Sequence, residues 1–311
     1  MRQFITGLVL ASVIQTSVLC QTNTKPFLGH WDFNIQTPTG THGSWLGITD
    51  KQGALDVWFQ PTGGHVRQVK NYKVEGSHLT LSLDQTSDIR PAMTWVLEAS
   101  GDRLVGVQKQ GEKSTPLTGV RAPELKGTAP KAWSRPEPLF DGKDLKGWEP
   151  IGDVKENHWT VTDGLLVNEA HGANLRTERT FNDFKVHFEV NCPDHANSGF
   201  YLRGRYEVQL ESEPLSKNPP ERRIGSIYGR IAARGDLPRP AGQWETFDIT
   251  LVGRTVTVVR NGVTVIDARE IDGITGGALD ANEGQPGPFY VQGDHTGGLK
   301  FRNITVSVPK T

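Results

Sequence analysis

One short stretch of the sequence, YEVQLES at residues 206–212, carries polar groups at alternate positions. In a strand, the side chains of Glu207, Gln209 and Glu211 therefore lie on one face and apolar side chains on the other. Two carboxyl groups cleave glycosidic bonds when they stand about 5–5.5 Å apart for retention, or about 6.5–9.5 Å apart for inversion. The stretch is thus a glycosidase acid/base pair, a row of sugar-binding groups, or the solvated face of a sheet.

The spacing does not suit the ordinary two-carboxylate mechanism. Same-face neighbours lie about 6.6 Å apart and the outer pair about 13 Å apart, from a rise of about 3.3 Å per residue. Glu207 and Glu211 reach the inverting distance only if both side chains lean inward. Gln209 between them carries no charge. The spacing leaves Glu207 and Glu211 open as catalytic groups or substrate contacts and Gln209 as a substrate-binding group, with the wet edge of a sheet as the alternative for Glu211.

A second catalytic candidate is His295 in VQGDHTGG. It follows a predicted strand on which Tyr290, Gln292 and Asp294 share a face. A histidine at a strand end beside glycines reaches into a cleft as a base or a metal ligand, or else caps a surface turn. We expect Gln292 to contribute to substrate binding from the same face.

Two further substrate-binding candidates are Tyr228 and Arg203. Tyr228 in GSIYGR is flanked by small residues and suits stacking on a pyranose ring, with core packing as the alternative. Arg203 is expected to share a strand face with Tyr201, where a guanidinium binds a planar polar partner or faces the solvent.

Metal and nucleotide chemistry find little support. Asp194 and His195 stand in CPDHANSG, which we interpret as a turn. No HxH, HExxH or CxxC spacing occurs, so a dedicated zinc site is not predicted; a divalent ion held by Glu207 and His295 stays open as an alternative. Neither GxxxxGK[ST], nor GxGxxG after a strand, nor GxSxG is present, which argues against nucleotide binding and a nucleophile elbow.

Composition bounds the class of protein. The 311 residues suffice for about two domains. Glycine occurs 35 times and proline 19 times, which favours short strands and turns over long helices. The net charge of −1 gives no electrostatic argument for nucleic acid or anionic membranes as partners.

The first 20 residues predict export. Arg2 precedes an apolar segment, FITGLVLASVI, that is typical of a secretory signal peptide and too short for a membrane span. We therefore expect a periplasmic or secreted protein. A lipid anchor at Cys20 is the alternative. Cys192 is the other cysteine, and its place on the apolar side of a strand predicts a core residue.

Residues 25–125 are dense in short alternating strands and predict a small antiparallel β-barrel or sandwich. The opening FLGHWDF resembles the start of lipocalin-like barrels. Residues 126–138 hold three prolines without alternation and read as a linker. The barrel's core is expected to include or adjoin four tryptophans: Trp31, Trp45, Trp58 and Trp95.

Residues 139–308 form a second strand-rich unit. Asp163-Gly164 and Asn261-Gly262 each mark a hairpin between two strands. FKVHFEVNC at residues 184–192 alternates strictly between apolar and polar. Sheets with one apolar face stack into a β-sandwich, so the fold class is all-β throughout.

Seven motifs in fixed order resemble the 3-keto-disaccharide hydrolase family, long called domain of unknown function 1080. The resemblance covers about residues 138–308 and implies a concanavalin A-like jelly roll in a typically exported bacterial protein. The motifs are LFDGKDLKGWEP (139–150), NSGFYLRG (197–204), YEVQLES (206–212), GSIYGR (225–230), GQWETFDITLVG (242–253), RNGVTVID (260–267) and GPFYVQGDHTGGLKFRNI (287–304).

The resemblance implies cleavage of glycosides whose sugar carries a 3-keto group. The ketone acidifies the C2 hydrogen, so one base, one electrophile and positioning groups suffice for elimination followed by hydration. Glu207 is then the base or a metal ligand, with Arg203 and Gln209 on hydroxyls or the enolate oxygen. An upstream sugar 3-oxidoreductase must supply the ketone. The alternatives are a non-catalytic, lectin-like carbohydrate-binding module of the cell envelope and a structural envelope protein.

Overall fold

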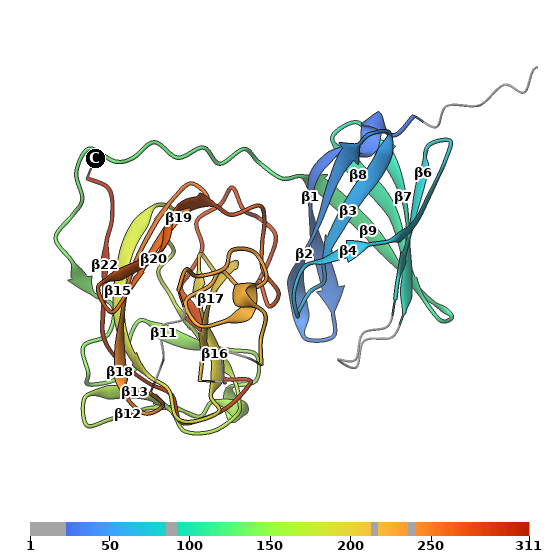
Figure 1. Cartoon of the computed structure of the whole chain (residues 1–311). Helices are drawn as coiled ribbons and strands as arrows, with labels where there is room; N and C mark the ends of the chain where they lie inside the picture. The colour runs from blue at the N-terminus through green and yellow to red at the C-terminus, as the bar shows by residue number, and fades with distance from the viewer. Residues whose placement is uncertain (1–22, 85–91, 213–216, 236–239, 311) are drawn as a thin grey trace, which may run out of the picture.

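The structure is a computed structural model, which describes residues 23–84, 92–212, 217–235 and 240–310. The predicted signal peptide and Cys20 lie outside these residues. Two bodies of β structure follow each other along the chain, a barrel drawn in blue to teal and a sandwich drawn in yellow-green to red (Figure 1). The predicted all-β fold class is confirmed for the described residues, whose only helices are three 3-10 turns. None of the helices in this part of the chain is long and apolar enough to cross a bilayer.

The first body is one nine-stranded antiparallel sheet in the order β4-β3-β2-β1-β9-β8-β7-β6-β5. Its two outermost strands, β4 and β5, are separated in the sequence by Lys70 alone. A sheet whose edges are joined by one residue must curl round, and the result is the barrel of Figure 1. The strands are β1 (Gly29–Thr37), β2 (Gly40–Lys51), β3 (Ala54–Gln60), β4 (Arg67–Val69), β5 (Asn71–Glu75), β6 (His78–Leu83), β7 (Met93–Ser100), β8 (Arg103–Gln110) and β9 (Lys113–Arg121).

The four tryptophans divide between the two faces of this sheet. Trp31 and Trp95 are fully buried in the barrel core, as expected. Trp45 lies next to Leu46, a core residue, and therefore points outward, where it packs against the sandwich. Trp58 points outward in the same way and is 40% exposed. Of the four tryptophans expected in or near the barrel core, Trp31 and Trp95 therefore lie within it, whereas Trp45 and Trp58 lie on the outer face of the same sheet.

The second body is a jelly-roll sandwich of an eight-stranded and a five-stranded antiparallel sheet. The larger sheet runs β12-β13-β22-β15-β18-β19-β20, with β10 beside β22, and the smaller runs β11-β14-β21-β16-β17. Its strands are β10 (Glu137–Pro138), β11 (Trp148–Ile151), β12 (Trp159–Thr162), β13 (Leu165–Asn168), β14 (Asn174–Thr177), β15 (Phe184–Asn191), β16 (Asn197–Leu202), β17 (Tyr206–Glu211), β18 (Trp244–Val252), β19 (Thr255–Arg260), β20 (Val263–Glu270), β21 (Tyr290–Val291) and β22 (Lys300–Ser307).

The predicted alternation and hairpins of the sandwich are confirmed. Asp163-Gly164 joins β12 to β13 and Asn261-Gly262 joins β19 to β20, with all four residues at positive φ. The alternate apolar residues of β15 are buried between the sheets. Phe188 stacks on Phe200 of the smaller sheet at 4.2 Å between ring centroids, so the two sheets meet through aromatic contacts. Cys192 is buried in this core, as predicted.

Residues 126–138 run in extended form from the barrel along the sandwich (Figure 1). Lys126 bridges to Gly253, and Trp133 bridges to Pro309 near the C-terminus. Strand β10 then adds to the edge of the larger sheet beside β22. The segment is therefore held against the sandwich at several points.

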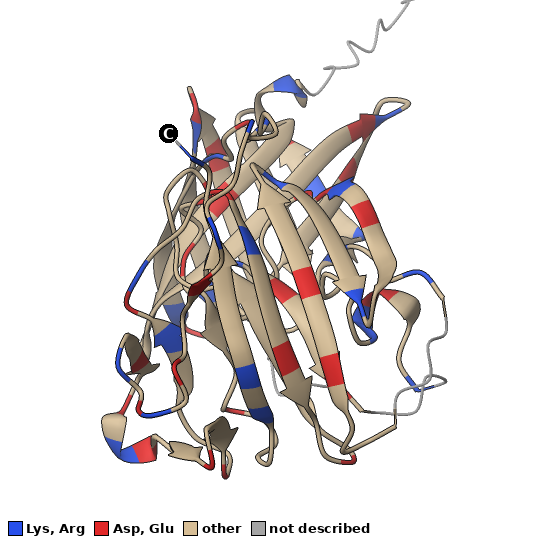
Figure 2. Cartoon of the chain, turned by 90° about the vertical axis from the view of Figure 1, so that its left-hand side faces the viewer, with Lys and Arg blue, Asp and Glu red and all other residues tan. Residues whose placement is uncertain are grey.

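On the outer strands of the sandwich, acidic and basic residues are interspersed, in keeping with the small net charge (Figure 2).

Backbone hydrogen bonds join the outer face of the barrel to the sandwich loop between β20 and β21. The amide of Gly43 donates to the carbonyl of Ala278, and the amide of Gly277 donates to the carbonyl of Thr62, each at 3.0 Å. The Asn34 side chain accepts from the amide of Ala281 at 2.8 Å. These contacts fix the loop between the two bodies.

Buried charges complete this interface. Glu283 of the sandwich accepts from the Tyr206 hydroxyl at 3.0 Å and from Arg254 at 3.1 Å. Asp32 on the outer face of β1 is also buried. Burial raises the pKa of Asp32, and the nearby Glu283 carboxyl raises it further. Arg254 and Arg205 oppose the shift without cancelling it.

The interface predicts how stability depends on pH. In the unfolded chain the Asp32 carboxyl ionises near pH 4, whereas the folded protein retains its proton to higher pH. Above pH 4 the folded state therefore holds more protons, and stability falls as the pH rises to the folded-state pKa. We expect Asp32→Asn to reduce the loss of unfolding free energy between pH 5 and pH 8 by at least about 1.4 kcal/mol, the equivalent of one pKa unit.

Urea unfolding at both pH values measures this difference. Asp267→Asn, which changes an exposed aspartate on β20, is the control and should leave the pH dependence unchanged. An identical pH dependence in the wild type and Asp32→Asn would contradict the argument.

Candidate functional site

Polar side chains gather on the outer face of the smaller sheet of the sandwich. Strands β21, β16 and β17 lie side by side there, with Tyr201 opposite both Glu207 and Tyr290 in the two registers. Alternate residues of the same strands, such as Phe200 and Val208, face the core. Alternation therefore brings to one face the residues between them. This face would be a wet surface if it stood alone, but the barrel covers part of it.

A cavity of about 330 Å³ lies over this face, and we call it the site cavity. The sandwich supplies its floor and most of its walls, and the barrel supplies four residues. Its lining comprises His42, Thr62, Gly63 and Gly64 from the barrel, and Ile151, Asn174, Asn197, Tyr201, Glu207, Gln209, Tyr228, Gly276, Gly277, Leu279, Tyr290, Gln292, Asp294 and His295 from the sandwich.

The carboxyl group of Glu207 forms part of the floor. Its side chain lies over Gly199 on the neighbouring strand. A Cβ atom at position 199 would be only 2.5 Å from Oε1 of Glu207, so only a glycine leaves room for the carboxyl group. Burial raises the pKa of Glu207 to about 8, although a hydrogen bond with Tyr201 and the charge of His295 oppose the shift. The carboxyl group of Glu207 is therefore mostly protonated at neutral pH, and it loses its proton when the pH rises above about 8.

Two stacked tyrosines form the adjoining part of the floor. The rings of Tyr201 and Tyr290 are 3.9 Å apart and nearly parallel. Their hydroxyl groups donate to the carbonyls of Gly276 and Gly277, at 2.7 and 2.6 Å. The amide of Gln292 donates to the Tyr201 hydroxyl at 2.9 Å. The tyrosines thus hold in place the loop that contacts the barrel.

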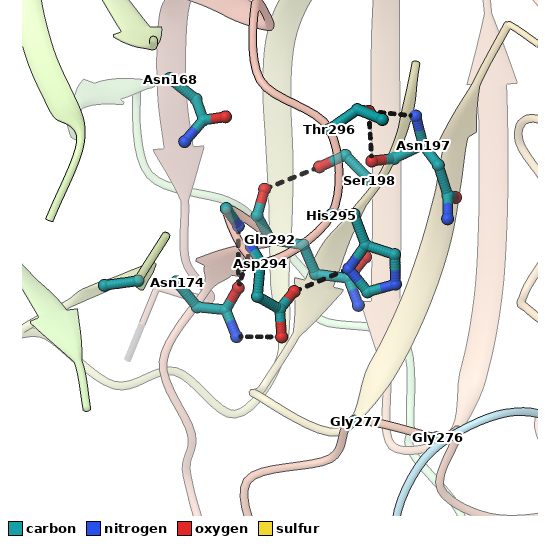
Figure 3. A network of polar contacts seen from close by, with 12 residues as sticks. Asn168, Asn174, Asn197, Ser198, Gly276, Gly277, Gln292, Asp294, His295 and Thr296 are labelled. Atoms are coloured by element: carbon teal, nitrogen blue, oxygen red, sulfur yellow. Dashed lines mark hydrogen bonds and ion pairs between the residues drawn. The ribbon is translucent and has the colours of Figure 1, made fainter. Parts of the chain in front are cut away.

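An aspartate–histidine pair stands at the rim of the site cavity (Figure 3). Nδ1 of His295 lies 2.7 Å from Oδ1 of Asp294. Asn174 donates to Asp294 at 3.3 Å and accepts from the amide of Gly293 at 2.8 Å, which fixes the chain at this point. The hydrogen bond to Asp294 raises the pKa of His295, and the charge of Glu207 adds to this. His295 therefore binds a proton more readily than an ordinary histidine.

Amide groups line another wall. The Gln209 side chain donates to the Asn197 side chain at 3.0 Å. The backbone of Asn197 is fixed in turn by Thr296. The Thr296 hydroxyl accepts a hydrogen bond from the backbone N–H of Asn197 at 2.6 Å and donates one to its backbone carbonyl at 3.0 Å (Figure 3). Amide groups held by hydrogen bonds are suited to binding hydroxyl groups in defined positions.

The barrel covers part of the site cavity. Residues 62–64 lie against the Gly276-Gly277 turn, where a Cβ on Gly276 would stand within 1.9 Å of the carbonyl oxygen of Gly64. His42 adds a ring whose pKa is lowered by burial, so it is neutral at pH 7. These contacts are not predictable from the sequence, because PTGG at residues 61–64 has the composition of an ordinary turn.

Five of the seven predicted site residues line the site cavity: Glu207, His295, Gln209, Tyr228 and Gln292. Arg203 and Glu211 do not. The sequence pattern did not predict roles for Asn174, Asn197 and the barrel residues, and treated Tyr201 and Asp294 only as face neighbours. A strand pattern identifies same-face residues but does not show which loops approach them.

Arg203 corrects the prediction that it shares a strand face with Tyr201. Strand β16 ends at Leu202, and Arg203 takes a positive φ of 52° in the following turn. Its buried guanidinium donates to the carbonyl of Gly253 at 2.8 Å and to the Tyr206 hydroxyl at 3.3 Å. The turn directs the side chain away from the site cavity.

Glu211 corrects the alternative of a wet strand edge. It is buried, and its carboxylate accepts from the amide of Ile224 at 3.1 Å. It therefore helps to hold the 219–228 segment over β17.

Asp194 and His195, by contrast, lie in the predicted turn and are exposed. Among the described residues, no group of three or more His, Cys, Asp or Glu side chains is arranged to hold a metal ion.

Comparison with known proteins gives one family match. The family model described as 3-keto-alpha-glucoside-1,2-lyase-like domain matches residues 135–307, which is more than half of the chain. This region contains the whole sandwich and every site-cavity residue except the four from the barrel. The curated proteins include no match to the chain.

Solved structures that resemble part of this chain include the following three. A "putative glycosyl hydrolase" from Parabacteroides distasonis ATCC 8503 is 29% identical, covering 59% of this chain and 93% of that chain, with a TM-score of 0.47. A second protein of that description from the same organism is 18% identical, covering 56% and 93%, with a TM-score of 0.46. The carbohydrate binding module CBM66 from Bacillus subtilis is 13% identical, covering 52% and 96%, with a TM-score of 0.33.

The contact between Glu207 and Gly199 predicts a destabilising substitution. Gly199→Ala places a methyl group where the Glu207 side chain lies, so one of them must shift. Overpacking of this kind costs about 1–3 kcal/mol, which we expect as a loss of unfolding free energy in urea. Gly284→Ala is the control, because its Cβ would meet Pro123 at an ordinary 3.5 Å. If Gly199→Ala were as stable as the wild type, the position of the Glu207 side chain would not depend on the absence of a side chain at residue 199.

Proposed function

The chain belongs to the family of 3-keto-alpha-glucoside-1,2-lyase-like domains, and on this premise we propose that it cleaves the glycosidic bond of 3-keto-glycosides. One observation carries the proposal. A buried carboxyl group with a raised pKa shares a cavity of about 330 Å³ with a histidine held by an aspartate. Perturbed ionisable groups in a cavity with fixed polar walls are typical of catalytic sites.

The reaction needs one base and one acid. Glu207 removes the proton from C2, which the neighbouring C3 ketone has made acidic. The electrons of the C2–H bond form an enolate, which then expels the C1 substituent with the electrons of the C1–O bond. A proton passes to the departing oxygen. Addition of water across the new C1–C2 double bond then gives the free 3-keto sugar.

The raised pKa suits Glu207 to the role of base. A general base works best when its pKa lies near the working pH, because an ordinary carboxylate is too weak to remove a carbon-bound proton. With a pKa of about 8, the ionised form is both accessible and strongly basic. The Tyr201 side chain stands beside this carboxyl group and lowers its pKa, against the larger effect of burial.

The His295–Asp294 pair suits the role of acid. Asp294 fixes the ring through Nδ1, which leaves Nε2 of a protonated imidazole to donate to the departing oxygen. Gln209, Gln292 and Asn197 are suited to hold the sugar hydroxyl groups and the enolate oxygen. Of the predicted substrate contacts, Arg203 and Glu211 have no part in this scheme.

A lectin-like binding module is the second candidate, favoured by the amide-lined wall. The raised pKa of Glu207 argues for catalysis instead, because sugar binding needs no carboxyl group held protonated in a floor. We further propose export to the periplasm or beyond, and an upstream sugar 3-oxidoreductase that supplies the ketone.

The activity is tested by incubating the full-length protein with 3-keto-trehalose and following release of glucose. Glu207→Gln should lower kcat by about 10²–10⁴-fold, the usual contribution of a general base. Glu211→Gln is the matched control on the same strand face and should retain activity within a few-fold. A chelator added in parallel decides whether a metal ion takes part. Binding of the 3-keto sugar without turnover in the wild type would favour the binding module.

The two pKa shifts predict the pH dependence. Turnover needs Glu207 without its proton and His295 with its proton, so kcat/KM of the wild type should be bell-shaped. His295→Gln removes the descending limb. Its residual rate should rise with pH to a plateau above about pH 8, where Glu207 has lost its proton. A residual rate that is constant between pH 6 and pH 8 would exclude Glu207 as the base.

A further inference from the structure

A second and larger cavity, of about 440 Å³, lies between the barrel and the sandwich, and we call it the interface cavity. The outer face of β1–β3 forms one side, and the sandwich forms the other. Its lining comprises His30, Trp45, Gly47, Thr49, Asp56, Trp58 and Val66 from the barrel, and Glu221, Gly229, Arg230 and Asp272 from the sandwich.

The interface cavity adjoins the site cavity but is distinct from it. Between the two lies the contact of His65 with Gly229, where a Cβ on Gly229 would stand 2.9 Å from Cβ of His65. Gly64 and Tyr228, on one side of this contact, line the site cavity. Val66, on the other side, lines the interface cavity. Among the residues that the structure describes, none lines both cavities.

The exposed indole of Trp58 forms a fixed flat wall. Its Nε1 donates to the Asp56 carboxylate at 3.1 Å. Asp56 is held in turn by Gln68 at 2.7 Å and by Lys51 at 2.6 Å. Here the ring is oriented before any ligand arrives, which lowers the entropic cost of binding.

A second tryptophan stands beside the first. Gly47 is the cross-strand partner of Trp58, and the Trp45 ring lies over Gly47, where a Cβ would stand 2.2 Å from the indole. Arg230 of the sandwich covers Trp45 at 4.3 Å from its ring centroid. The two indoles therefore adjoin across Gly47, and Trp58 is the one left accessible.

The polar groups around Trp58 select against anions. Asp56, Asp272 and Glu221 bring three carboxyl groups to the lining, against the guanidinium of Arg230 and the ammonium of Lys51, which pairs with Asp56. Such an excess repels phosphates and acidic sugars. Carboxylates accept hydrogen bonds from hydroxyl groups, and an indole face packs against the C–H face of a sugar ring. A neutral, hydroxyl-rich ring fits both features.

We propose that the interface cavity is a second, non-catalytic binding site for a neutral sugar, whose ring stacks on Trp58. The choice of a sugar as ligand rests on the proposed function. The fixed orientation of the Trp58 ring and the carboxyl groups around it are observed independently of that function. Binding there retains a carbohydrate chain beside the site cavity without taking part in bond cleavage. The barrel thus contributes a sugar contact that the sandwich alone lacks.

The test uses the full-length protein on an array of neutral gluco- and manno-oligosaccharides, with sialylated and sulfated glycans as charged controls. Glu207→Gln prevents turnover, and the best neutral ligand is then measured by isothermal titration calorimetry. Trp58→Ala in this background should weaken binding at least ten-fold, and Trp58→Phe should restore part of it. Trp133→Ala, a tryptophan remote from both cavities, should have no effect.

Melting temperatures of the variants show that each is folded. Binding of no neutral glycan, or affinity unchanged by Trp58→Ala, overturns the proposal, as does preference for the charged glycans. These outcomes are separate from the 3-keto-trehalose assay. Turnover with no Trp58-dependent binding defeats the second site alone, whereas Trp58-dependent binding without turnover supports the second site and defeats the proposed catalysis.

Discussion

The burial of one carboxyl group is the constraint on which the site depends. Glu207 lies flat on a sheet because Gly199, across the strand pair, has no side chain to stand in its way. Its burial among the surrounding side chains reduces its solvation, and the loss of solvation raises its pKa. A carboxyl group on an open strand face would remain an ordinary, weakly basic carboxylate.

The barrel makes the face of the sandwich into a cavity. Its 62–64 turn lies on the Gly276-Gly277 turn, which the two tyrosine hydroxyls hold from below. Floor and roof are thus connected by hydrogen bonds through one loop. Asp32 and Glu283 bring buried carboxyl groups to the same interface, at a cost in stability that rises with pH. The contacts that shape the cavity are therefore also those that join the two bodies.

Much of the fold follows from local pattern. Strict alternation along β15 and the Asp-Gly and Asn-Gly turns specify strands and hairpins without reference to the rest of the chain. The same alternation placed Glu207 and Gln209 on one face, which was correct. It failed for Arg203, because a strand pattern does not reveal where the strand ends, and a single residue at positive φ redirected the side chain.

The sequence by itself determined the β architecture, the family and the row of polar groups on β17, because each depends on residue order along a strand. Only the tertiary structure decided which of those groups are functional candidates. Glu211 and Glu207 have the same type and the same face, yet one is held by the backbone of Ile224 and the other faces a cavity. That difference comes from loops distant in sequence, including a turn of the barrel, whose approach no local pattern encodes.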